Sequence, residues 1–390
     1  MLRYKAGILL FICTFLLVAC VNDDNDERTA KDNSKKQISV TEKSLDTTFL
    51  VTRVNEITIS AIGDLLIHQT VYQDAFNGTQ YNFNPMFDAV QPFLEESTIT
   101  IANQETMIGG VELGLSTYPS FNTPQEMGEA LKDSGIDVVT IANNHTLDKG
   151  EAGIQSAISH WESINMMYTG AYKNKQDKQK IRVLQTDQNI SVAFLAYTYG
   201  TNGISVPRGK EYLVNRIDKR RIAADIKRAK EQSDVIVLSL HFGTQYERMP
   251  NQEQKDLVQF AADQGVQVVI GHHPHVLQPV DYVKGKNGNK TFVAYSLGNF
   301  LSGQDEFYRR IGGMVKFTVR KTETKEEPDK IEIVSPKFLP TFVDYESETD
   351  FEVIPMYQLT NDTLPNADKH YNEIRRHMSQ LLPELEFIEE

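Results

Sequence analysis

The sequence Val266-Gln267-Val268-Val269-Ile270-Gly271-His272-His273-Pro274-His275 leads from an apolar segment directly into three histidines. Its first five residues form a short run rich in β-branched side chains, which predicts a buried strand. The histidines therefore follow the carboxyl end of a strand, where ligands and catalytic groups collect in open α/β sheets. Three histidines beside a glycine and a rigid proline indicate a metal or catalytic site. The alternative is that one or two of them are hydrogen-bonded packing residues.

Strand and helix signals alternate upstream of this stretch, which predicts a layered α/β domain. Predicted strands cover residues 57–62, 98–102, 137–142, 191–197, 234–240 and 266–270. Predicted helices cover residues 85–96, 150–163, 217–232 and 252–264, and another begins at the capping-box pattern Thr123-Pro124-Gln125-Glu126. After residue 289, strand-like segments follow with few helices between them, at residues 291–296, 312–320 and 331–334. They predict antiparallel strands that complete a second sheet.

We divide the chain into four parts by composition and pattern. Residues 1–20 read as a lipoprotein signal peptide, and residues 21–52 as a polar, charged spacer that we expect to be disordered. Residues 53–345 form the predicted folded domain. Residues 346–390 form a C-terminal extension, with an exposed and charged terminal helix expected over residues 366–390.

The chain begins with a targeting segment. Arg3 and Lys5 form a positive region, residues 7–18 are apolar, and Leu17-Val18-Ala19-Cys20 is similar to a bacterial lipobox. The apolar run is shorter than a membrane span requires. We expect Cys20 to be lipidated and to tether the protein to the extracytoplasmic face of the cell membrane. The alternatives are an ordinary signal peptide and an uncleaved anchor.

Charge and cysteine content exclude several classes of protein. The formal net charge is −13, so we expect no nucleic-acid partner, because such a partner requires a basic face. Cys13 and Cys20 are the only cysteines, and both lie in the targeting segment, so metal ligands must be His, Asp, Glu or Asn. The sequence also lacks a Gly-x-x-x-x-Gly-Lys-Ser/Thr phosphate loop and a Gly-x-Ser-x-Gly nucleophile turn.

Polar side chains follow five other predicted strands in the same way. A single cluster of this kind is explained by turn formation or packing. Together, the clusters supply the oxygen and nitrogen donors that Mn, Zn, Fe and Mg accept. The clusters are Gly63-Asp64, Asn103-Gln104-Glu105, Asn143-Asn144-His145, His241-Phe242-Gly243 and Tyr295-Ser296-Leu297-Gly298-Asn299-Phe300. We predict that they form a site for divalent metal ions, with two ions as the expected number.

These motifs resemble those of the CapA (PgsA) capsule-synthesis proteins, a branch of the calcineurin-like metallophosphoesterase superfamily. The matching pieces also include Asp148 and Gly150, and they span residues 57–300. The resemblance implies a four-layer α-β-β-α sandwich of the metallophosphoesterase type, with the site at one edge. It also implies a role in making or exporting poly-γ-glutamate at the cell surface.

The resemblance implies a role for each site residue. Carried over by position, the metal ligands would be Asp64, Glu105 as the bridging carboxylate, Asn144, His241, His273 and His275. His145 would stabilise the transition state or protonate the leaving group as a general acid. We expect the substrate to be contacted by Asn103, Asn143, His272 and Asn299. The phosphoesterases begin with Asp-x-His, whereas His68 follows Asp64 by four residues, so we do not assign His68 as a ligand.

Two functions fit these features. The first is a surface-anchored, metal-dependent hydrolase or transferase that acts on an anionic capsule or envelope polymer. The second is a non-catalytic scaffold or export subunit that keeps the fold and works with other capsule-synthesis membrane subunits. A solute-binding lipoprotein is a third class, but it has no need for histidines at several strand ends. Bound metal favours the first function, and polymer production by site variants favours the second.

Overall fold

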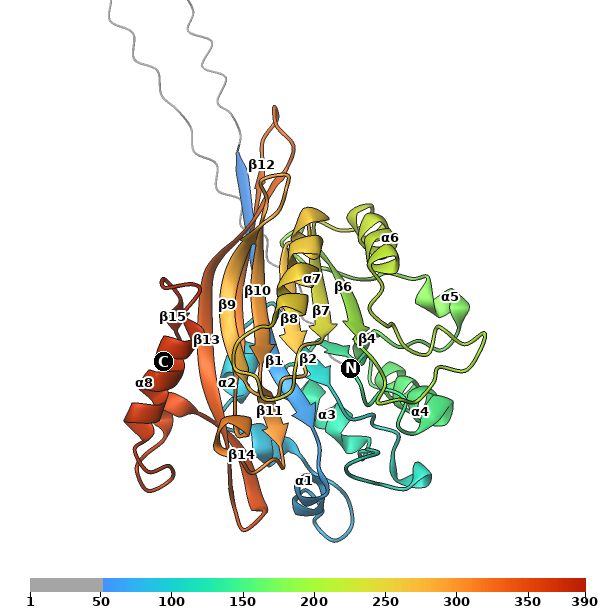
Figure 1. Cartoon of the computed structure of the whole chain (residues 1–390), viewed down its shortest axis with the longest axis vertical. Helices are drawn as coiled ribbons and strands as arrows, with labels where there is room; N and C mark the ends of the chain where they lie inside the picture. Colours follow the sequence, from blue (N-terminus) through green and yellow to red (C-terminus); the bar gives the residue numbers. More distant parts are fainter. Residues whose placement is uncertain (1–51) are drawn as a thin grey trace, which may run out of the picture. The chain divides into compact units, whose positions relative to one another are not determined.

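Two β-sheets pack face to face in the computed structural model, which describes residues 52–390 (Figure 1). The predicted signal peptide, Cys20 and the spacer up to residue 51 lie outside the described residues. The first sheet has the strand order β14-β13-β12-β1-β2-β3-β4, with β11 beside β1 and β15 beside β13. Its strands are β1 (Arg53–Leu66), β2 (Ile99–Gln104), β3 (Val138–Thr140), β4 (Met167–Thr169), β11 (Asn299–Ser302), β12 (Ile311–Glu323), β13 (Lys330–Glu346), β14 (Thr349–Pro355) and β15 (Glu386–Phe387).

The second sheet comes from the middle of the chain and has the order β5-β6-β7-β8-β10-β9. Its four central strands run parallel, and β5 and β9 pair antiparallel at its two edges. Its strands are β5 (Arg182–Gln185), β6 (Ser191–Thr198), β7 (Val235–His241), β8 (Val268–His272), β9 (Leu277–Lys284) and β10 (Lys290–Leu297).

Helices cover the outer face of each sheet, so the predicted four-layer α-β-β-α sandwich is confirmed. α1 to α4 pack on the first sheet, and α6 and α7 pack on the second. The helices are α1 (Gln69–Asp74), α2 (Gln91–Glu95), α3 (Glu126–Asp133), α4 (Gly150–Ser163), α5 (Lys175–Lys178), α6 (Lys219–Lys230), α7 (Gln252–Asp263) and α8 (Ala367–Met378). Within residues 52–390, no helix is both long and apolar enough to cross a bilayer.

The central strands are buried on both faces, which explains their continuous apolar sequences. In β7, Val235 and Val237 face the other sheet, whereas Ile236 and Leu238 face the helices. β6, β8 and β10 alternate in the same way. Because each strand is fixed from both sides, the polar residues at its carboxyl end have a defined position.

The C-terminal strands differ from the prediction. β10 joins the second sheet as expected, but β12 and β13 extend the first sheet beside β1. β13 also crosses the boundary predicted at residue 345, and β14 pairs with it. Residues 346–390 are therefore part of the same folded unit. The predicted terminal helix is shorter than residues 366–390, and α8 buries one face, including Ile374 and Met378, against the core between the sheets.

Two helix predictions also differ in their limits. Thr123 does not cap a helix, because its Oγ1 donates a hydrogen bond to Thr106 Oγ1 (2.7 Å) and α3 starts three residues later. The single helix predicted over residues 85–96 is divided into a 3-10 turn (Asn84–Phe87) and α2. Pro92 explains the division, since proline lacks the N–H that a continuous helix needs and clashes with the preceding turn.

Gly271 allows two strands to approach closely just before the histidines. A Cβ atom at this position would lie 2.0 Å from the carbonyl oxygen of Tyr295 on β10. Any side chain would therefore push β8 away from β10 and move the turn that carries His273 and His275.

The packing between the sheets leads to a stability prediction. Phe292 is fully buried there, and its ring centroid lies 5.3 Å from that of Phe317 and 5.4 Å from that of Tyr282. We expect Phe292→Ala to lower the free energy of unfolding by about 3–5 kcal/mol, because it leaves a cavity between the sheets. Urea denaturation measures the change. The control is Phe76→Ala, at a residue that is 45% exposed, with an expected loss below about 1 kcal/mol. Equal losses in both variants would contradict the packing described.

Candidate metal centre

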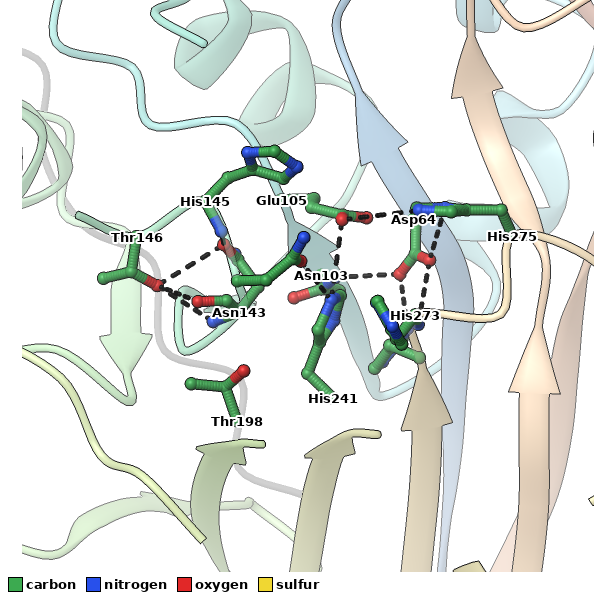
Figure 2. A network of polar contacts seen from close by, with 12 residues as sticks. Asp64, Asn103, Glu105, Asn143, His145, Thr146, Thr198, His241, His273 and His275 are labelled. Atoms are coloured by element: carbon green, nitrogen blue, oxygen red, sulfur yellow. Dashed lines mark hydrogen bonds and ion pairs between the residues drawn. The ribbon is translucent and has the colours of Figure 1, made fainter. Parts of the chain in front are cut away.

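Strand ends from both sheets meet at one edge of the sandwich and bring the predicted ligands together, as Figure 2 shows for most of them. The candidates come from β1 (Asp64), the residue after β2 (Glu105), the turn after β3 (Asn144), the end of β7 (His241) and the turn after β8 (His273 and His275). None of these side chains belongs to a residue more than 4% exposed. Parallel strands explain this convergence, because their carboxyl ends lie at the same edge of each sheet.

Glu105 occupies the centre of this group. Its Oε1 lies 3.5 Å from His241 Nε2 and 3.7 Å from His275 Nε2. It is fully buried, and neither carboxylate oxygen receives a hydrogen bond from the residues that the structure describes. Burial raises the pKa of this carboxyl group to about 7, although the charge of His275 opposes the rise.

Asp64 lies beside it and is held from several sides. Its Oδ1 accepts a hydrogen bond from Asn103 Nδ2 (2.8 Å), and its Oδ2 accepts one from the backbone N–H of His273 (3.2 Å). His272 Nδ1 is 3.0 Å from Oδ1, but without the geometry of a hydrogen bond in the described contacts. Burial alone would raise the pKa of Asp64, but the neighbouring histidines His272 and His275 hold it well below its usual range.

The histidine turn has an unusual backbone. His273 has φ 99° and His275 has φ 57°, in the region that favours glycine. Such conformations cost about 1–3 kcal/mol each and persist where the surrounding contacts impose them. Here they direct both rings toward Glu105, while Asn299 Oδ1 lies 3.0 Å from His275 Nδ1 and orients that ring.

The two turn histidines differ in protonation. Burial lowers the pKa of His273 to about 2, with His241 and His275 adding to the decrease. Burial also lowers the pKa of His275, but the charges of Glu105 and Asp64 and a hydrogen bond to Asp64 raise it overall to about 9. Burial and neighbouring histidines hold the pKa of His241 well below its usual range. His241 and His273 are thus neutral, which is the form that ligates metals, whereas His275 would release a proton when a metal binds.

The donor atoms form two overlapping groups. In each group, one ligand atom from every residue lies within 4.8 Å of the others; the groups are Glu105–His241–His273 and Asp64–Glu105–His275. Both share Glu105, whose orphaned oxygens need a cation. Asn144 Oδ1 lies 2.7 Å from His241 Nε2 and adds an oxygen at the edge of the first group. Carboxylate, amide and imidazole donors without thiolates fit divalent Mn, Fe or Zn.

His145 lies beside these groups with a partner that the sequence analysis did not assign. Its Nδ1 is 2.7 Å from Asp148 Oδ2, which also accepts the backbone N–H of Phe121 (2.7 Å). Asn202 Nδ2 also approaches Nδ1, at 3.4 Å, but the shorter contact assigns the Nδ1 proton to the bond with Asp148. Asp148 therefore orients the ring and leaves Nε2 for other partners. The spacing of three residues in a turn was the available signal.

The four residues expected to contact substrate are instead buried and engaged. Their exposed fractions are 1% for Asn103, 0% for Asn143, 2% for His272 and 0% for Asn299. Asn143 Oδ1 accepts the backbone N–H of His145 (2.9 Å), and the other three contact Asp64 or His275. Their contacts hold the candidate ligands and His145 in place, and their contact with a substrate stays a prediction.

Other side chains complete the surroundings. His68 Nδ1 lies 2.9 Å from the carbonyl oxygen of Leu66, and His68 is outside both donor groups. Tyr199, which follows β6, is 49% exposed, and its ring centroid is 4.6 Å from that of His273. Tyr199 is not an acid, an amide or a histidine, so the pattern of metal ligands at strand ends does not include it.

The family model for the bacterial capsule synthesis protein PGA_cap matches residues 58–304. The chain belongs to this family. The matched range contains every candidate ligand and His145. The recognition made from the sequence motifs is therefore confirmed.

Relatives and solved structures of known proteins resemble the chain. The PGA biosynthesis protein CapA of Bacillus subtilis (strain 168) is 26% identical, over 69% of this chain and 69% of its own length. The capsule biosynthesis protein CapA of Bacillus anthracis is 28% identical, over 70% of this chain and 66% of its own length. One solved structure is the calcineurin-like phosphoesterase YfkN from Bacillus subtilis, with 13% identity over 83% of this chain and 100% of that chain and a TM-score of 0.44. Another is the 5′-nucleotidase from Candida albicans SC5314, with 14% identity over 84% of this chain and 58% of that chain and a TM-score of 0.39. At these scores, neither structure supports a conclusion about chemistry.

The shared position of Glu105 gives a prediction about metal content. We expect the purified full-length chain to contain divalent metal and Glu105→Gln to lose nearly all of it, because both donor groups lose their common anion. Asp148→Asn is the matched control, since it also replaces a buried carboxylate by an amide but outside both groups, and it should keep the wild-type content. Plasma mass spectrometry measures the metal, and circular dichroism checks the fold. A folded Glu105→Gln protein with undiminished metal would contradict the assignment.

Proposed function

We propose that the protein is a lipid-anchored enzyme of capsule biosynthesis that hydrolyses or transfers a bond in an anionic capsule or envelope polymer at a dinuclear metal centre. The single observation that carries this proposal is the buried carboxylate of Glu105, without a hydrogen-bond partner in the described residues and shared by two donor groups. Buried polar groups are normally hydrogen-bonded, so these orphaned oxygens indicate a missing partner. Two cations, one on each side of the carboxylate, would give both of its oxygens a partner.

The donor set fits two ions on either side of Glu105. Asp64 and His275 would hold one ion, and His241 and His273 the other, with Asn144 beside His241. When bound, a metal pair clamps a tetrahedral or carbonyl centre and supplies hydroxide near neutral pH. The buried and fixed positions of these side chains keep the reacting group dry and oriented.

His145 has the geometry of a general acid in this scheme. The carboxylate of Asp148, 2.7 Å from Nδ1, holds the proton of Nδ1 and fixes the ring. Nε2 then carries the proton that would pass to the departing oxygen or nitrogen. Phe121, with its ring centroid 4.7 Å from that of His145, limits the movement of the ring.

The cellular setting follows from the sequence. We propose that Cys20 is lipidated, that the domain acts at the extracytoplasmic face of the membrane, and that poly-γ-glutamate is the polymer. Other membrane subunits of capsule synthesis are the proposed protein partners. The names printed for the two CapA relatives support the link to capsule biosynthesis. A scaffold without catalysis is the alternative, and it needs the fold but not the donor set.

Turnover tests the role of His145. We expect His145→Ala to lower kcat by about 10²- to 10⁴-fold and Asp148→Asn by about tenfold or more, with bound metal unchanged in both. Release of nitrophenol from bis(p-nitrophenyl) phosphate and cleavage of γ-glutamyl oligomers are the two assays. Full turnover in a metal-loaded His145→Ala protein would exclude this histidine from the reaction.

Polymer production distinguishes the enzyme from the scaffold. We expect strains that carry His241→Ala or Glu105→Ala to lose surface polymer as completely as a deletion strain, because each change removes a donor of the metal centre. Immunoblots must show normal levels of the variant proteins, and Lys227→Ala, on the exposed side of α6, is the control. Normal polymer in the two site strains would favour the scaffold and count against catalysis.

A further inference from the structure

A tyrosine with a strained backbone stands beside the metal centre. Tyr246, in the loop between β7 and α7, has φ 68°, which a bulky side chain rarely adopts. Its backbone N–H donates to the carbonyl oxygen of Pro274 (2.8 Å), the residue between His273 and His275. Its ring is 41% exposed, and its centroid lies 6.2 Å from that of His275. This hydrogen bond and the backbone conformation therefore hold an accessible aromatic ring against the histidine turn. Residues with strained backbone conformations concentrate at functional sites.

Arg309 lies on this ring and is connected to the same histidine. Its guanidinium carbon is 3.6 Å from the centroid of Tyr246, a cation–π contact. Its backbone carbonyl accepts a hydrogen bond from Asn299 Nδ2 (2.8 Å). Asn299 Oδ1 in turn lies 3.0 Å from His275 Nδ1. One asparagine thus fixes both the candidate ligand and the segment that presents the arginine.

A cavity of about 260 Å³ opens between these loops. Tyr246, Arg248 and Arg309 line it, together with Val276, which directly follows His275. The charged residues of this lining are two arginines and one acid, Glu306, so the lining is locally cationic in a chain with a net charge of −13. Clefts of one sign of charge attract ligands of the opposite sign, even on a protein of unfavourable total charge.

The two arginines already bind carboxylates of the chain, but in different ways. Glu373 of α8 lies 2.8 Å from Arg248 Nη1 and within 3.3 Å of the Tyr308 hydroxyl, which anchors the helix. Glu306 lies 3.0 Å from Arg309 Nη2, yet its side chain is 68% exposed. An ion pair this exposed adds little stability. A ligand carboxylate can therefore replace Glu306 on Arg309 at little cost.

We propose that Arg309 and Tyr246 form a subsite that binds a carboxylate of the polymer next to the metal centre, with Glu306 occupying Arg309 until that carboxylate arrives. The proposal rests on the proposed function, in which the metal centre acts on an anionic polymer. It names the substrate class as a chain with a carboxylate on each repeat unit, such as a γ-glutamyl chain. The planar fork of arginine matches a carboxylate with two hydrogen bonds and sets the register of the chain over the metal centre.

The two residues of the ion pair give opposite predictions. With the metal-loaded full-length chain and a γ-glutamyl decamer as the probe, we expect Arg309→Gln to weaken binding by about tenfold and Glu306→Gln to strengthen it by about threefold. Arg309→Lys should lie between wild type and Arg309→Gln, because it keeps the charge but not the fork. Isothermal titration calorimetry at constant salt measures binding, so the test does not depend on turnover.

Matched controls separate the subsite from total charge. Arg320→Gln removes a positive charge from an arginine that pairs with Glu56 on the first sheet, and Glu326→Gln removes an exposed negative charge from the turn between β12 and β13. Neither should change binding by more than about twofold. Metal content is measured in every sample, since the subsite variants should retain it.

Each outcome has a defined meaning. Opposite shifts for Arg309→Gln and Glu306→Gln, with unchanged controls, support the subsite. Weaker binding in both variants, or no change in either, overturns it, because a purely structural ion pair behaves in that way. Arg309-dependent binding of poly(glycerol phosphate) without binding of the γ-glutamyl decamer overturns the carboxylate assignment. A wild-type protein without metal contradicts the proposed function, whereas a metal-loaded protein whose binding ignores Arg309 contradicts the subsite alone.

Discussion

The buried carboxylate of Glu105 is the constraint on which the rest of the site depends. Removing a carboxylate from water without a donor or a cation costs several kcal/mol, and burial here raises its pKa to about 7. His241 and His275 approach it from β7 and from the turn after β8, so the second sheet supplies its neighbours. The site therefore exists only while the two sheets keep their positions relative to each other.

The four-layer fold maintains the relative position of the sheets with apolar packing and close backbone contact. Alternate residues of the central strands bury against the opposite sheet and against helices, which fixes each strand end. Gly271 lets β8 approach β10, and the turn that follows holds two histidines at positive φ. Three asparagines then orient the side chains of the site, because each contacts a functional residue or its backbone; they are Asn103, Asn143 and Asn299. Stability and site geometry thus arise from the same contacts.

The sequence contained enough information for the layers and for the set of converging residues, because apolar period and strand-end position are local patterns. The limits of α4 were predicted to the residue, and those of α6 and α7 to within two. It did not reveal that β12 and β13 extend the first sheet, since strand partners are chosen by tertiary packing. Nor did it distinguish exposed residues at strand ends from buried ones. Asn103 and Tyr199 both follow strands, yet one is buried and the other is half exposed.

Membership of the PGA_cap family places this metal-competent site in a capsule-synthesis protein. We propose that two cations share the carboxylate of Glu105, which belongs to both donor groups. The most direct test is anomalous X-ray diffraction at the manganese edge from crystals of the manganese-loaded protein. The account predicts two peaks, one on each side of Glu105, with Asp64 and His275 on the first and His241 and His273 on the second. A single peak that does not touch Glu105, or no peak at this edge of the sandwich, would contradict it.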